Sequence, residues 1–122
     1  MKKRVLVIDD AATVREYHCS ILKEAGFETE EAVNGLEALE KALKNPFDLY
    51  IVDINMPKMD GYSFLKELRT QKIPQVPAIM VSTEAEEKDR ESAFKAGANL
   101  YLVKPVTPEI LLRYVKILLG EV

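Results

Sequence analysis

Polar side chains stand directly after four of the five segments expected to form strands in this 122-residue sequence. Aspartates follow the first and third of these segments, hydroxyl residues follow the fourth, and a lysine follows the fifth. Carboxylates can hold a divalent cation, while hydroxyl and ammonium groups can contact phosphoryl oxygens. The set consists of Asp9, Asp10, Asp53, Ser82, Thr83 and Lys104.

The three aspartates repel one another if the first and third strands are neighbours, at the ~4.8 Å spacing of paired strands. At ~4 Å and an effective dielectric of about 20, each pair of charges costs roughly 4 kcal/mol, so the cluster needs a cation or raised pKa values. All candidate ligands are oxygen atoms, and no cysteine or histidine is placed to join them. The sequence therefore predicts a site for Mg²⁺, or for Mn²⁺ in its place, rather than zinc.

A magnesium site of this kind suits phosphoryl transfer. Magnesium keeps several waters and takes substrate phosphate oxygens beside one or two carboxylates. Lys104 and either Ser82 or Thr83 would then neutralise and hydrogen-bond the charge on the phosphoryl oxygens. The pattern indicates a phosphoryl-transfer centre rather than a structural metal cage.

Parallel strands covered on both faces are the elements expected to position these side chains. Residues 5–8, 49–52, 78–81 and 100–103 are continuous apolar runs, as buried parallel strands require. Residues 28–33 are instead rich in glutamate, which predicts a strand at a sheet edge.

Segments with helical spacing alternate with the strands. Apolar residues recur at helical intervals around residues 14–25, 36–43, 64–68 and 111–118, and a weaker pattern predicts a helix over Glu84–Ala96. Gly26 and Gly97 stand where left-handed caps end helices, while Thr107 and Pro108 open the last one. This alternation predicts a doubly wound α/β fold with its site at the carboxyl ends of the strands.

Bulk composition places the chain among single-domain proteins, spanning residues 1–122. The net charge is −3 and no basic run is present, which disfavours nucleic-acid binding. The single cysteine, Cys19, is expected to be a buried helix residue and gives no sign of an oxidising compartment. Neither a signal peptide nor a membrane segment is expected, so the predicted location is the cytoplasm.

Several motifs together resemble the response-regulator receiver domain, in its stand-alone CheY-like form. They are the start Val-Leu-Val-Ile-Asp9-Asp10, the run Asp53-Ile-Asn-Met-Pro-Lys-Met-Asp-Gly61, the strand end at Ser82, and Lys104-Pro105. The resemblance covers essentially the whole chain. It implies a flavodoxin-like (βα)5 sandwich with the parallel strand order 2-1-3-4-5.

The resemblance also implies a two-component signalling role. Asp53 would accept a phosphoryl group from the phosphohistidine of a histidine kinase or a phosphotransfer protein. Asp10 and Asp53 would bind Mg²⁺ directly, Asn55 through its backbone carbonyl and Asp9 through water. Such a chain acts as an enzyme only on its own phosphorylation and dephosphorylation. The sequence does not separate chemotaxis from another phosphorelay.

A conformational switch is the second implication of the resemblance. Lys104 would bind a phosphoryl oxygen, Ser82 would move toward the phosphate, and Tyr101 would turn inward as the adjoining loop closes. The Lys104-Pro105 peptide bond is expected to be cis. Thr83 departs from the family, which usually has a smaller residue there; it would either crowd the phosphoryl group or share the hydroxyl role.

A surface for a downstream protein is expected on the fourth helix, fifth strand and fifth helix. The last helix carries more apolar residues than one buried face needs, so some should remain exposed for a target protein or a homodimer. His18 is expected to be a partly exposed helix residue without a catalytic role. Glu84 is expected in the first turn of the fourth helix, with a modest influence on phosphate lifetime.

Two other classes of function compete with this interpretation. A metal-dependent phosphatase of the haloacid-dehalogenase type also uses a strand-end aspartate, but it carries a second aspartate where this chain has Asn55, and no residues remain for a cap. A phosphorylation-independent binding module of the same fold is the other alternative. The complete set of acids, Ser82 and Lys104 argues against it.

Overall fold

The computed structural model describes residues 2–121, which form five strands and five helices in strict alternation. The strands are β1 (Arg4–Ile8), β2 (Glu28–Ala32), β3 (Leu49–Val52), β4 (Ala78–Ser82) and β5 (Leu100–Val103). The helices are α1 (Ala12–Glu24), α2 (Gly35–Lys44), α3 (Gly61–Leu68), α4 (Glu87–Ala96) and α5 (Pro108–Leu118). None of these helices is long and apolar enough to cross a membrane.

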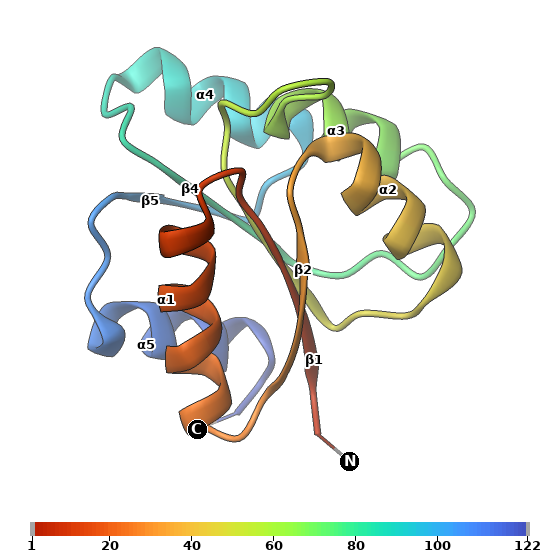
Figure 1. Cartoon of the computed structure of the whole chain (residues 1–122). Helices are drawn as coiled ribbons and strands as arrows, with labels where there is room; N and C mark the ends of the chain where they lie inside the picture. Colours follow the sequence, from red (N-terminus) through yellow and green to blue (C-terminus); the bar gives the residue numbers. More distant parts are fainter. Residues whose placement is uncertain (1, 122) are drawn as a thin grey trace.

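The sheet is entirely parallel, in the order β2-β1-β3-β4-β5. Helices α1 and α5 cover one face, and α2, α3 and α4 cover the other (Figure 1). The flavodoxin-like fold and its strand order are thereby confirmed. Because β1 lies between β2 and β3, strand order reverses beside β1, which is where ligands of such sheets bind.

Each face of the sheet has its own apolar core, because successive strand residues point to opposite sides. In β3, Tyr50 and Val52 pack toward α2, α3 and α4, in a core that contains Phe64. Leu49 and Ile51 pack toward α1 and α5 on the other face. This burial on both sides explains why the central strands are apolar at every position.

The edge strand β2 is charged, as its sequence predicted. Glu30 forms an ion pair with Arg4 of the neighbouring strand, and Glu31 pairs with Arg15 of α1 at 2.8 Å. Charged side chains along an unpaired edge discourage association with other strands. The prediction of an edge strand over residues 28–33 is therefore confirmed.

Local capping signals define most helix ends. The Thr107 hydroxyl accepts a hydrogen bond from the Ile110 amide at the start of α5, and Gly97 ends α4 with φ of 113°. The predicted start of α4 at Glu84 is wrong, since the helix begins at Glu87. Glu86 and Asp89 form a capping box there, and these reciprocal bonds fix the first turn.

Candidate phosphoryl-transfer site

Two neighbouring strands bring the buried acids of the site together. Residues Ile8 of β1 and Val52 of β3 are partners in the sheet, so the next residue of each strand lies at the same edge. The Asp53 amide donates to the Ile8 carbonyl oxygen at 2.9 Å, which continues the strand pairing up to the acid itself. Strand register therefore sets the separation of Asp9 and Asp53.

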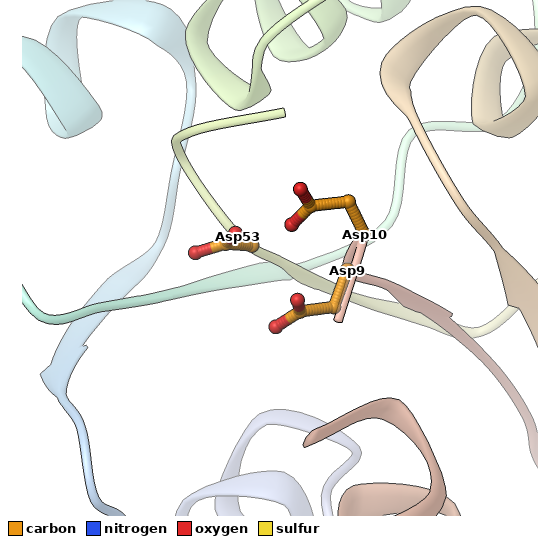
Figure 2. A group of neighbouring side chains, drawn as sticks. All are labelled: Asp9, Asp10 and Asp53. Atoms are coloured by element: carbon orange, nitrogen blue, oxygen red, sulfur yellow. The ribbon is translucent and has the colours of Figure 1, made fainter. Parts of the chain in front are cut away.

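Asp9, Asp10 and Asp53 form one carboxylate cluster. Each contributes an oxygen atom, and these oxygens all lie within 4.8 Å of one another (Figure 2). Asp9 is only 2% exposed and Asp53 8%, whereas Asp10 lies on the surface. The cluster is thus a buried pair of acids with a third acid at its mouth, open to a cation from solvent.

Lys104, which directly follows β5, contacts this cluster. Its Nζ donates to Oδ2 of Asp9 at 2.8 Å and to Oδ1 of Asp53 at 3.2 Å. Burial alone lowers the pKa of Lys104, but the bond to Asp9 and the charges of both carboxylates outweigh it and raise the pKa overall. Lys104 is therefore a permanently charged partner held against the acids.

The pKa of Asp53 is raised. Burial is the main cause, and the negative charge of Asp9 adds to it, while Lys104 opposes both effects. The Asp9 carboxylate is held in place by the Ala11 amide, which donates to its Oδ1 at 2.9 Å. One ammonium group thus compensates only part of the negative charge, and the site favours a further cation.

The loop after Asp53 depends on a glycine. A Cβ on Gly61 would lie 2.2 Å from the carbonyl oxygen of Asp53, so any larger side chain would displace the acid's backbone. The Gly61 amide instead donates to the Ile54 carbonyl oxygen at 2.8 Å. Asp60 caps α3 by accepting from the Ser63 amide at 2.7 Å. Asn55 is exposed on this loop, two residues after Asp53.

Ser82 and Tyr101 meet at the loop that follows β4. The Ser82 Oγ accepts from the Glu84 amide at 3.1 Å, and the Tyr101 hydroxyl donates to the Glu84 carbonyl oxygen at 2.7 Å. Tyr101 is 4% exposed and therefore points inward. Glu84 takes part through its backbone and lies outside α4, contrary to expectation. Thr83 is exposed beside these residues.

The sequence did not predict two features near the site. The guanidinium of Arg90 lies 5.6 Å from the centre of the Tyr101 ring, a cation–π contact that no strand-end pattern reveals. His18, expected to be partly exposed, is 3% exposed instead.

The expected cis bond between Lys104 and Pro105 is present.

Comparison with known proteins assigns the family. The model of the response regulator receiver domain matches residues 5–116, so the chain belongs to this family. The chain is 37% identical over 119 residues to the transcriptional regulatory protein SrrA of Staphylococcus aureus. That alignment covers 98% of this chain and 48% of SrrA, so the chain spans about half the length of the curated relatives it matches.

Solved structures give the same family. A putative response regulator from Chloroflexus aurantiacus superposes with a TM-score of 0.94 at 34% identity, covering 99% of this chain and 100% of that one. The chemotaxis protein CheY4 of Vibrio cholerae gives a TM-score of 0.91 at 38% identity, covering 97% and 99%. The chain is therefore a receiver domain of two-component signalling in both sequence and fold.

Proposed function

We propose that this chain is a phosphoacceptor switch in which Asp53 receives a phosphoryl group from a phosphohistidine. The observation that carries the proposal is the contact of one half-buried lysine with two buried carboxylates, inside a cluster of three acids. A buried acid pair with incomplete charge compensation is costly for a purely structural role. It suits a site that gains a cation and a phosphoryl group.

In the proposed transfer, an Asp53 carboxylate oxygen attacks the phosphorus atom. The phosphorus–nitrogen bond of the phosphohistidine breaks as the new phosphorus–oxygen bond forms, and the imidazole leaves with the bonding electron pair. Lys104, already 3.2 Å from Asp53, would bind a phosphoryl oxygen and neutralise its charge.

The donor set fits magnesium. Asp10 and Asp53 would bind Mg²⁺ directly, Asn55 through its backbone carbonyl and Asp9 through a water, with Mn²⁺ able to substitute. When bound, the ion supplies positive charge that orients and neutralises the phosphoryl oxygens. The chain's own part is to hold oxygen ligands within 4.8 Å of one another at a solvent-facing mouth.

Phosphorylation would bias the loop after β4. The new phosphoryl oxygens attract the Ser82 hydroxyl, which now accepts from the Glu84 amide. Because Tyr101 donates to the same residue's carbonyl oxygen, movement of Ser82 and of the Tyr101 ring would be coupled. Thr83 either crowds the phosphoryl group or adds a second hydroxyl.

Output would pass through the face formed by α4, β5 and α5. Phe94 of α4 is 51% exposed, and Ile110 and Ile117 of α5 are also exposed, as expected for the last helix. We propose that a downstream protein, or a second copy of the chain, binds there after phosphorylation. A histidine kinase or phosphotransfer protein would be the donor, in the cytoplasm, with residues 1–122 acting as one receiver unit.

Intact-protein mass after incubation with phosphoramidate, with and without Mg²⁺, tests the central claim. The wild type should gain one phosphoryl group only with Mg²⁺, and Asp53→Asn should gain none. Asp48→Asn is the matched control, since Asp48 lies at the opposite end of β3 and should leave the gain intact. Labelling of Asp53→Asn would show that another residue accepts the phosphoryl group. No gain by the wild type with any donor would favour a binding module that works without phosphorylation.

A further inference from the structure

Helix α4 is attached to the rest of the domain differently at its two ends. It lies beside α3 on one face of the sheet (Figure 1). Near its C-terminal end, the side chains of Ala93 and Ala96 are buried. The guanidinium of Arg69, at the end of α3, donates twice to the Gly97 carbonyl oxygen, at 2.8 and 3.1 Å. This end of α4 is therefore fixed by both apolar and polar contacts.

The first half of α4 has no buried side chain to hold it. Residues 83–92, all of which the structure describes, are exposed or only partly buried. Segments with few buried apolar contacts are the ones that open locally at a low cost in free energy. The position of this end of α4 therefore depends on its polar contacts.

Two tyrosine hydroxyl groups supply contacts at this end, from opposite sides. The Tyr62 hydroxyl, in the first turn of α3, donates to the Asp89 carbonyl oxygen at 3.2 Å. The Tyr101 hydroxyl donates to the Glu84 carbonyl oxygen at 2.7 Å, and the Arg90 guanidinium lies 5.6 Å from the centre of the Tyr101 ring. Tyr101 already belongs to the proposed switch, whereas Tyr62 has no part in it so far.

Tyr62 is placed to connect the phosphoryl site with α4. It follows Gly61, whose amide donates to the carbonyl oxygen of Ile54, the residue next to Asp53. Its ring is partly buried and packs against the apolar core on this face of the sheet. The ring is therefore anchored in α3 while the hydroxyl group reaches the first turn of α4.

We propose that Tyr62 is a positioning residue of the switch: its hydroxyl holds the first turn of α4 against α3, and α4 pivots about Gly97 when this bond opens. Glu84 and Asp89 belong to one short segment, so movement of Ser82 away from the Glu84 amide would draw that turn away from Tyr62. This coupling rests on the proposed phosphoacceptor function, whereas the contact that holds α4 does not.

Hydrogen exchange of backbone amides in the unphosphorylated protein tests whether Tyr62 holds α4. Tyr62→Phe keeps the ring and removes only the hydroxyl group. Exchange at residues 90–92, followed by NMR, should be about fivefold faster than in the wild type, as the loss of one net hydrogen bond gives, and exchange at residues 95–98 should be unchanged. Equal rates at residues 90–92 in the two proteins would overturn the proposal, and so would equal acceleration along the whole of α4.

Tyr17→Phe is the matched control. It also removes a tyrosine hydroxyl that donates to a backbone carbonyl oxygen, that of Val106 at 3.0 Å. Because neither residue belongs to α3 or α4, exchange at residues 90–92 should stay at the wild-type rate. The same acceleration in this variant would overturn the proposal, since a general loss of stability would then explain the effect of Tyr62→Phe.

A second measurement tests the coupling to Asp53. The wild type and Tyr62→Phe are treated with phosphoramidate and Mg²⁺, and intact mass records the gain of a phosphoryl group. Phosphorylation should speed exchange at residues 90–92 in the wild type and have a smaller effect in Tyr62→Phe, where the bond is already missing. An equal increase in both proteins, or none in the phosphorylated wild type, would overturn the pivoting of α4. If the wild type gains no phosphoryl group, the phosphoacceptor function fails, and exchange in the unphosphorylated protein still decides whether Tyr62 holds α4.

Discussion

Charged side chains have opposite surroundings at the two ends of the parallel strands, which are called the amino edge and the carboxyl edge of the sheet below. At the amino ends of β4 and β5, Arg69 donates to the carbonyl oxygens of Gly97, at 2.8 Å, and Val76, also at 2.8 Å. Asn99 of the same network accepts from the Ala78 amide at 3.0 Å. At the carboxyl ends, three carboxylates gather, and two of them, Asp9 and Asp53, share the ammonium group of Lys104.

The difference separates a structural site from a functional one. Arg69 is one cation surrounded by neutral acceptors, so its donors are satisfied without any ligand. Lys104 is one cation facing an excess of negative charge, which only a further cation can relieve. The excess of negative charge at the carboxyl ends of the strands therefore favours binding of a cation, whereas the contacts of Arg69 at the amino ends need no ligand. Three substitutions test this contrast.

Lys104→Met should have the largest effect. It leaves Asp9 and Asp53 buried without a cation, so the free energy of unfolding near pH 7 should fall by about 2 to 4 kcal/mol. Because the ammonium group no longer repels a metal, Mg²⁺ should stabilise the variant more than it stabilises the wild type. Urea unfolding with EDTA and with excess Mg²⁺ measures both quantities.

One outcome would contradict the claim that the acids at the carboxyl edge bind a cation. If Mg²⁺ stabilises Lys104→Met no more than the wild type, the carboxylates are not the metal's ligands. Lys95→Met is the control, because Lys95 is exposed on α4 and its removal leaves no buried charge. Its stability should stay within about 0.5 kcal/mol of the wild type.

Arg69→Met should have the next largest effect. The substitution removes the donors of the Gly97 and Val76 carbonyl oxygens, which should lower the free energy of unfolding by about 2 kcal/mol. Mg²⁺ should not restore that loss, and phosphorylation by phosphoramidate should still occur in the folded fraction. Urea unfolding and intact mass provide the two readouts. Restoration by Mg²⁺ would mean that the two edges are energetically coupled.

The sequence predicted the sheet and the clustering of the strand-end side chains well because both depend on short-range signals. Apolar runs predicted four of the strands, and the polar residues after three of these runs gave Asp9, Asp53 and Lys104. Register brings Asp9 and Asp53 together, and the long side chain of Lys104 reaches them from the end of β5. The strand order could be predicted only from the resemblance to the family. The prediction of which helix faces are buried was less accurate. Helix α2 buries Ala38 and Ala42, whereas Leu36, one of the apolar residues that predicted the helix, is exposed.

Long-range contacts were the part that the sequence could not supply. His18 is buried on α1 beside the loop after β5, and the bond from Tyr17 to Val106 joins these elements across 89 residues of sequence. Arg69 reaches Gly97 only because α3 and α4 are adjacent, and a Cβ on that glycine would lie 2.6 Å from the arginine side chain. Nothing local marks either partner, so spacing and periodicity do not detect such pairs.

Asp53→Asn should have the smallest effect on stability, in the opposite direction. The pKa of Asp53 is raised above its ordinary 3.8, so its ionised form is less favourable in the folded chain than in the unfolded chain. This cost is absent below pH 3.8, where the acid is protonated in both states, and it is complete above the folded-state pKa. The variant should therefore be more stable than the wild type near pH 7, by less than either of the two losses above, and the gain should shrink as pH falls.

Thermal unfolding in EDTA across a series of pH values checks the sign of that effect. Asp60→Asn is the control, because asparagine also caps helices, so its stability should follow the wild type at every pH. A gain for Asp53→Asn that is independent of pH would show that lost repulsion is not the cause. A loss of stability would show that Lys104 already compensates the cluster fully, and the contrast between the two edges would disappear.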